Sequence, residues 1–146
     1  MSAITLSADA NRLTLADVRR VWQQPVRMLL DDATMQKLAD GAGFVAAALE
    51  RHEPVYGINT GFGALAKEAI AEHDLVQLQN NLLLSHSAGT GEYLDDAIVR
   101  LILVLKIINL AQGYSGVSPS LVQALCALLE HEIYPCIPSK GSVGAS

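Results

Sequence analysis

Basic charge, cysteine and clustered histidine are all scarce in this sequence. Its 146 residues hold ten lysines and arginines against fifteen aspartates and glutamates, for a net charge of −5. We therefore expect no nucleic-acid partner, because such partners are bound by a basic patch. The two cysteines, Cys126 and Cys136, lack the spacing of a zinc site or a disulfide framework. The four histidines form no His-x-x-x-His pair, so we expect no metal site.

Long uninterrupted apolar runs are also missing, although 51% of the residues are hydrophobic. The most apolar stretch, residues 97–111, is interrupted by Arg100, Lys106 and Asn109. It is too short and too charged to span a bilayer and is typical of a buried helix, with the charged heads reaching water. The N-terminus has no charged segment followed by an apolar run, so no signal peptide is expected. These features favour a cytoplasmic protein without membrane contact.

Helix signals dominate the chain. Thr14, with Asp17 three residues later, is typical of a capped helix start, and Pro25 ends that helix. Ser118 followed by Pro119 marks another start. Further helices are expected from Asp31–Asp32, from Asp74 to about residue 88, and from Asp95 or Asp96 to near Gly113. Two extended pieces, residues 4–6 and 12–15, are the main strand signal. We predict an all-α fold over residues 1–146, with no internal domain boundary.

Residues 55–63 form a glycine-rich segment, with Asn59 and Thr60 between glycines. Three glycines in so short a stretch predict a loop with unusual backbone angles. From Gly61 onward the letters also fit G-x-G-x-x-A, a variant of the dinucleotide fingerprint. That fingerprint needs a strong preceding strand and an acidic residue about 20 positions later, and this sequence offers neither. On its own, Tyr56 in this loop would be read as an aromatic side chain packed on the core.

His86 continues a stripe formed by Leu75, Leu78 and Leu82, at spacings of three and four residues. This spacing predicts that the side chain faces inward with the leucines. A lone histidine on such a face is usually a core residue that is satisfied by a structural hydrogen bond. The spacing by itself therefore favours a structural role.

The last eight residues, 139–146, are almost all small. Such a segment is most simply a flexible loop or a frayed end. Gly144-Ala145-Ser146 is also compatible with the start of a G-x-S-x-G nucleophile elbow. That motif needs a strand leading into the serine, and Pro138, Lys140 and Gly141 argue against one.

Four segments together resemble the aromatic amino acid ammonia-lyase family. They are residues 56–63 (YGINTGFG), 84–89 (LSHSAG), 105–117 and 141–146 (GSVGAS). They occur in the family's order and cover most of the chain from Tyr56 onward. The resemblance implies the family's all-α, fumarase/aspartase-like fold, of which this chain would be the N-terminal part. It also implies a homotetramer whose active sites are shared between subunits.

The resemblance implies a cofactor made from protein. In the family, an Ala-Ser-Gly triplet cyclises to 4-methylideneimidazol-5-one, an electrophile that captures the amino acid substrate. Ala145 and Ser146 match its first two members, and the third would be residue 147, beyond this chain. The ring closes when the amide nitrogen of that third residue attacks the first residue's carbonyl. The isolated chain is therefore expected to be inactive, and no external cofactor is expected.

The resemblance also assigns roles to three side chains. Tyr56 matches the family's tyrosine that acts as a catalytic base or proton relay, and Ser85-His86 resembles the histidine ammonia-lyase version of the substrate-selecting segment. The implied reaction is elimination of ammonia from L-histidine to give trans-urocanate, with His86 binding the imidazole. Some tyrosine aminomutases carry the same Ser-His pair, so a tyrosine ammonia-lyase or aminomutase is the first alternative. A non-catalytic helical fragment is the second.

Overall fold

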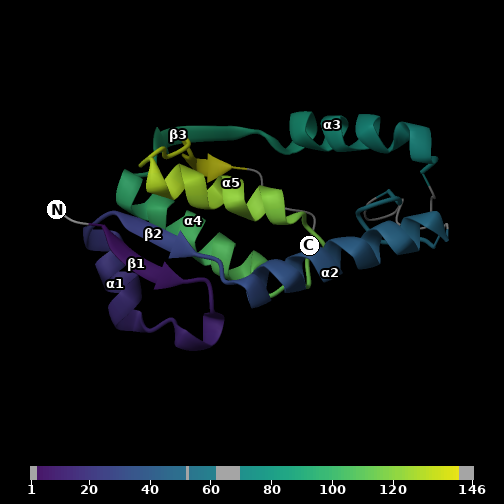
Figure 1. The fold of residues 1–146 in the computed structure, drawn as a ribbon. Helices are drawn as coiled ribbons and strands as arrows, with labels where there is room; N and C mark the ends of the chain where they lie inside the picture. The colour runs from purple at the N-terminus through teal and green to yellow at the C-terminus, as the bar shows by residue number, and fades with distance from the viewer. Residues whose placement is uncertain (1–2, 52, 62–69, 142–146) are drawn as a thin grey trace. The chain divides into compact units, whose positions relative to one another are not determined.

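The structure, a computed structural model, describes residues 3–51, 53–61 and 70–141 and is mainly helical (Figure 1). The prediction of a helical fold is confirmed, and every expected helix is present within a few residues of its predicted bounds. The elements in chain order are β1 (Ile4–Ser7), η1 (Ala10–Arg12), α1 (Leu15–Gln23), β2 (Val26–Leu29), α2 (Asp32–Glu50), η3 (Glu72–Asp74), α3 (Leu75–His86), β3 (Gly89–Tyr93), α4 (Asp96–Leu110), α5 (Pro119–Glu130) and β4 (Pro138–Gly141).

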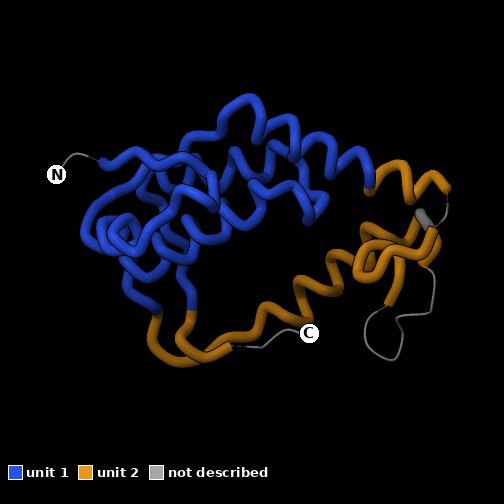
Figure 2. Tube along the Cα trace, turned by 90° about the horizontal axis from the view of Figure 1, so that it is seen from below, with its two compact units in different colours: residues 1–44, 94–137 blue, residues 45–93, 138–146 orange. Residues whose placement is uncertain are grey.

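Contacts divide the chain into two compact units, each made from two stretches of sequence (Figure 2). Unit 1 comprises residues 1–44 and 94–137, and unit 2 comprises residues 45–93 and 138–146. The boundary at residue 44 falls inside α2, so this helix contributes to both units. Tyr56, Ser85 and His86 belong to unit 2. The prediction that residues 1–146 form one portion of a catalytic chain stays a prediction.

Helices α1 and α5 begin directly after the capping residues that the sequence predicted. The Thr14 hydroxyl accepts a hydrogen bond from the Asp17 amide at 3.2 Å, and the Asp17 carboxylate accepts one from the Thr14 amide at 3.1 Å. This reciprocal pair is the predicted capping box of α1. At α5, the Ser118 hydroxyl accepts from the Leu121 amide at 3.3 Å, with Pro119 in the first turn. Both predicted caps are confirmed.

The strands are short, and the sequence predicted only the first of them. β1 and β2 pair in parallel, from Ile4 beside Val26 to Ser7 beside Leu29, with α1 as the crossover between them. In β2, Val26 and Met28 are buried whereas Arg27 and Leu29 are exposed, the alternation of a one-sided strand. Of the extended piece expected at residues 12–15, Leu13 and Thr14 have extended backbone angles, whereas Arg12 belongs to η1 and Leu15 to α1.

The core of the described residues lies in unit 1. There α4 packs against α1 and α5, and α5 also packs against β2 (Figure 1). Val21, Ile107 and Val122 are completely buried where these elements meet. Residues 97–111 therefore form the buried helix that the sequence predicted, although Ile102 and Leu105 on its other side are exposed.

Arg100 departs from the expectation that its head reaches water. The residue is buried, its Nε donates to the carbonyl of Val21 at 2.6 Å, and its Nη2 donates to the carbonyl of Trp22 at 2.7 Å. These carbonyls belong to the last turn of α1, where helices leave acceptors without an intrahelical donor. The guanidinium also lies over the Tyr134 ring, 5.7 Å from its centroid. The buried positive charge is stabilised by these two carbonyl oxygens at the end of α1.

The two glycines of α2 have different environments. A Cβ added to Gly41 would collide with the carbonyl oxygen of Gly113, whereas one added to Gly43 would meet nothing within 4 Å. Gly113 has φ +83°, which favours glycine, and its own Cβ position lies 2.8 Å from the carbonyl oxygen of Lys37. Gly41 is therefore needed for close packing, and α2 is not broken at either glycine.

This difference predicts opposite effects for two matched substitutions in one helix. Gly41→Ala should destabilise the full-length protein by about 1–3 kcal/mol, the usual cost of overpacking. Gly43→Ala should stabilise it by about 0.5–1 kcal/mol, because alanine is the better helix former. Thermal unfolding midpoints of the two variants should fall on opposite sides of the wild-type value. Shifts of the same sign would contradict the close approach of α2 to Gly113.

Candidate functional site

Tyr56 lies on a tight turn in unit 2. The amide of Ile58 donates to the carbonyl of Val55 at 3.0 Å, which closes a β-turn with Tyr56 and Gly57 at its two central positions. Gly57 has φ +76°, as the second central residue of a type II turn requires. The predicted loop with a glycine-specific backbone angle is confirmed. The turn leaves 59% of Tyr56 exposed, so the core-packed alternative for this side chain is wrong.

Two buried polar side chains hold this turn. The Asn59 carboxamide accepts from the Val55 amide at 2.7 Å and donates to the Glu53 carbonyl at 2.9 Å. The Thr60 hydroxyl accepts from the Gly57 amide at 3.3 Å and donates to the Gly61 carbonyl at 3.0 Å. Sequence reasoning recognised both residues only as turn formers. The sequence feature that could have indicated this role is a pair of hydrogen-bonding side chains between two glycines, close to the candidate base.

Ser85 and His86 lie together at the C-terminal end of α3. The Ser85 hydroxyl is 2.9 Å from Nδ1 of His86 and 3.2 Å from the carbonyl oxygen of Leu82. The same Nδ1 is 3.1 Å from that carbonyl oxygen. When Nδ1 carries the ring proton it donates to the carbonyl, and Nε2 becomes an acceptor. When Ser85 donates to Nδ1 instead, Nε2 carries the proton, so each hydrogen bond at Nδ1 goes with one of the two tautomers of His86.

The orientation predicted for His86 is corrected. Leu75, Leu78 and Leu82 are half-buried, so the predicted stripe exists, but His86 itself is exposed. No residue of α3 is buried in the described part of the chain. His86 is the last residue of α3, with Ser87 as the C-cap, and it lies one turn beyond Leu82, the last half-buried leucine of the stripe. The ring is available to a ligand and is not a core histidine of this chain.

The predicted ring-forming residues, Ala145 and Ser146, lie outside the described residues, as do residues 62–66 of the possible dinucleotide fingerprint. The expectation that no strand precedes the ring-forming residues is wrong. Residues 138–141 form β4, which pairs antiparallel with β3 from Gly89 beside Gly141 to Tyr93 beside Pro138. Proline is tolerated here because it is the first residue of the strand.

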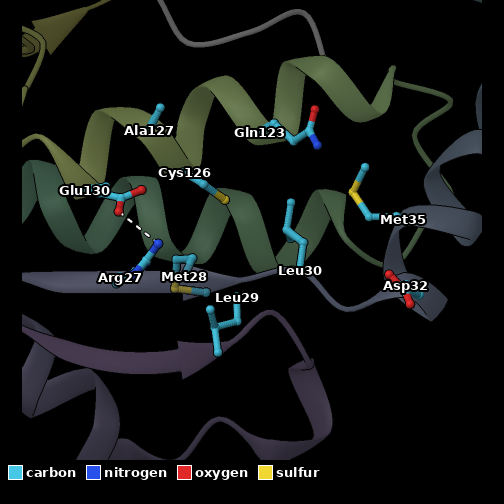
Figure 3. Close-up of a pocket in the computed structure, with 10 residues that line it drawn as sticks. All are labelled: Arg27, Met28, Leu29, Leu30, Asp32, Met35, Gln123, Cys126, Ala127 and Glu130. Atoms are coloured by element: carbon cyan, nitrogen blue, oxygen red, sulfur yellow. Dashed lines mark ion pairs between the residues drawn. The ribbon is translucent and has the colours of Figure 1, made fainter.

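An open pocket of about 580 Å³ lies in unit 1 and contains none of the predicted site residues (Figure 3). Figure 3 shows Arg27 and Glu130 joined by an ion pair of 3.0 Å, with Cys126 and Met35 also lining the pocket. Burial raises the pKa of the Cys126 thiol to about 11, and the charge of Glu130 contributes to the rise. The thiol is therefore protonated at neutral pH and is a poor nucleophile. We assign no catalytic role to this pocket.

In residues 3–51, 53–61 and 70–141, no three histidine, cysteine, aspartate or glutamate side chains are grouped as a metal site would require. Among the same residues, no helix has the length and apolar character needed to cross a membrane.

Comparison with known proteins gives concordant matches. The family model for aromatic amino acid lyases matches residues 13–146. A histidine ammonia-lyase from Aliivibrio fischeri is 51% identical over 142 residues, which are 97% of this chain and 28% of that protein. The chain thus spans little more than a quarter of the length of this curated relative.

Solved structures show the same fold. A tyrosine aminomutase mutant with a bound ligand superposes with a TM-score of 0.88 at 30% identity, covering 95% of this chain and 26% of that one. The histidine ammonia-lyase from Trypanosoma cruzi gives a TM-score of 0.81 at 28% identity, covering 98% of this chain and 27% of that one. The helical arrangement and the sequence thus agree, and the chain belongs to the aromatic amino acid lyase family.

Proposed function

We propose that the full-length protein is a histidine ammonia-lyase, which eliminates ammonia from L-histidine and releases trans-urocanate. The observation that carries the proposal is the 51% identity to a histidine ammonia-lyase across nearly the whole chain. The arrangement of Tyr56 and the Ser85-His86 pair supports it, because each presents an exposed polar group suited to its proposed role.

In this proposal, Tyr56 is the base that accepts a proton from the substrate's β-carbon while the amino group leaves from the α-carbon. A free phenol has a pKa near 10, so the residue must be activated in the complete site. The turn at Val55–Ile58 supports this role because it leaves Tyr56 59% exposed. Ala145, Ser146 and the residue after them would form the 4-methylideneimidazol-5-one group, which supplies the electrophile.

His86 is proposed to orient the imidazole of the substrate. Its Nδ1 has hydrogen-bonding partners within α3, whereas no hydrogen bond to Nε2 occurs among the described residues. With the proton on Nδ1, Nε2 accepts from the N–H of a substrate imidazole. With the proton on Nε2, the ring donates instead. Ser85 acts through this choice of tautomer and would complete the substrate-binding pair.

A tyrosine ammonia-lyase or aminomutase remains the second candidate, supported by the TM-score of 0.88 to a tyrosine aminomutase. The same Nε2 could accept a hydrogen bond from a phenol. Turnover of histidine and tyrosine by the full-length protein separates the two. Formation of urocanate with little change in tyrosine supports the first proposal, and the reverse result supports the second.

The proposal extends to assembly and location. We infer a homotetramer with shared active sites, located in the cytoplasm, from the family resemblance. The exposed leucines and valine of α3 support an additional contact, since Val76, Leu83 and Leu84 are uncovered in this chain. The amino acid substrate is a small molecule, and neither nucleic acid nor membrane is a proposed partner.

The proposed base predicts the effect of Tyr56→Phe in the full-length enzyme. Removal of the hydroxyl should lower kcat for histidine by about 10²–10⁴-fold, the usual contribution of a proton-transfer group. The matched control is Tyr114→Phe, at a tyrosine that is 94% exposed and outside the site. Steady-state kinetics of both variants test the role. A Tyr56→Phe enzyme as active as the control would show that the phenol transfers no proton.

The proposed imidazole contact predicts a change in substrate preference for His86→Leu. Loss of one buried hydrogen-bonding partner costs roughly 1–3 kcal/mol, or about five- to 150-fold in kcat/KM for histidine. Phenylalanine should then compete better, because leucine suits an apolar ring. His73→Leu is the control, since that side chain is 82% exposed and lies 3.3 Å from the carboxylate of its neighbour Asp74.

The kcat/KM values for histidine, tyrosine and phenylalanine decide this point, with circular dichroism as the check on folding. An unchanged ranking of the three substrates in His86→Leu would remove this residue from the pocket.

A further inference from the structure

Asn59 and Thr60 are buried, and their side chains bind the exposed turn that carries the proposed base. Asn59 is 9% exposed and Thr60 is 1% exposed, whereas Tyr56, three residues before Asn59, is 59% exposed. Buried polar side chains are usually retained because their hydrogen bonds fix a particular backbone. The groups they bind here belong to the residues on either side of Tyr56.

Asn59 holds the chain before the tyrosine. Its Oδ1 accepts from the amide of Val55 at 2.7 Å, and its Nδ2 donates to the carbonyl of Glu53 at 2.9 Å. Its own amide donates to the carbonyl of Val55 at 3.2 Å, and its carbonyl accepts from the amide of Ile70 at 2.8 Å. Side chain and main chain of this residue thus connect three separate points of unit 2.

Thr60 holds the chain after the tyrosine. Its hydroxyl accepts from the amide of Gly57 and donates to the carbonyl of Gly61, so both hydrogen-bonding capacities are used. A glycine has unusual backbone freedom, and Gly57 is the residue whose positive φ sets the direction of the turn. The threonine hydroxyl therefore restrains the most adaptable point next to Tyr56.

We propose that Asn59, assisted by Thr60, is a positioning residue for the elimination reaction. Together they clamp Val55 and Gly57 and so fix the direction from which the Tyr56 phenol approaches the substrate. The inference rests on the proposed function, because it requires Tyr56 to transfer a proton. Proton transfer needs the two heavy atoms within about 2.6–3.2 Å of each other, and a misplacement of about 1 Å can cost about 10²-fold.

A purely structural role makes a different prediction from a positioning role. If Asn59 acts through Tyr56, its loss should matter little once the phenol is gone. If it only stabilises the fold, its loss should lower activity by the same factor with or without the phenol. A double-mutant cycle between the two residues measures this difference.

The cycle uses Asn59→Leu, Tyr56→Phe and the double variant in the full-length protein, with kcat and KM for histidine as the readout. Leucine is close to asparagine in size and removes both side-chain hydrogen bonds. We expect Asn59→Leu alone to lower kcat by about 10²-fold. In the Tyr56→Phe background we expect a further loss below about threefold, since residues that act as a unit are non-additive. Equal factors in the two backgrounds would overturn the proposal.

A second pair decides the matter if Asn59→Leu does not fold, as judged by circular dichroism. Thr60→Val removes the hydroxyl and should lower kcat by about tenfold, whereas Thr60→Ser keeps it and should recover most of that loss. Thr5→Val, at an exposed position in β1, is the control for the substitution itself. Equal kcat for Thr60→Val and Thr60→Ser would contradict the role of the hydroxyl.

These results separate the inference from the function on which it rests. A wild-type protein that does not convert histidine would refute the proposed function. A wild-type protein that converts histidine, with additive effects of Asn59 and Tyr56, would refute the positioning role alone.

Discussion

Main-chain groups that lose contact with water need hydrogen-bonding partners, and this requirement shapes both units of the chain. In unit 1, the guanidinium of Arg100 satisfies the last carbonyls of α1 and so joins α1 to α4. In unit 2, the side chains of Asn59 and Thr60 satisfy the main chain of the Tyr56 turn. Among the described residues that are not exposed, no fully buried side-chain nitrogen or oxygen lacks a partner. The buried side chains of Arg100, Asn59 and Thr60 thus bind main-chain groups at defined points of the two units.

This constraint also connects the fold with the proposed chemistry. An exposed phenol in a glycine-rich loop would sample many positions if nothing restrained the loop. The buried side chains of Asn59 and Thr60 restrain the loop, while Tyr56 is 59% exposed. At the other proposed contact, the end of α3 restrains Nδ1 of His86 and leaves Nε2 for a ligand. In both places a local hydrogen bond sets the orientation of a group that faces outward.

Helices and their limits were predictable because their signals are local. Thr14 with Asp17, and Ser118 with Pro119, mark helix starts through contacts within one turn. The strands were harder, because β2, β3 and β4 have only four or five residues each and depend on distant partners. Pro138 and Gly141 argued against β4, yet both occur at its ends, where they interrupt little of the ladder.

For the proposed site residues, the sequence predicted part of the local structure and missed the rest. Glycines around Tyr56 predicted the turn, but the partners of Asn59 lie four and six residues away and leave no periodic pattern. The prediction that His86 faces inward failed because helical spacing describes a face of the helix and does not show whether another element covers that face. Arg100 was expected at the surface because a long charged side chain usually reaches water. Instead, its Nε donates to a carbonyl in the last turn of α1, which is 79 residues away in sequence.

The central claim is that this chain is the N-terminal part of a lyase acting on histidine through an electrophile formed from its own backbone. The intact mass of the purified, full-length protein tests it most directly. Our account predicts a mass lower than that of the translated sequence by two water molecules. Ser146→Ala should prevent the second loss and abolish turnover of histidine. An unmodified mass in a preparation that converts histidine to urocanate would contradict the account.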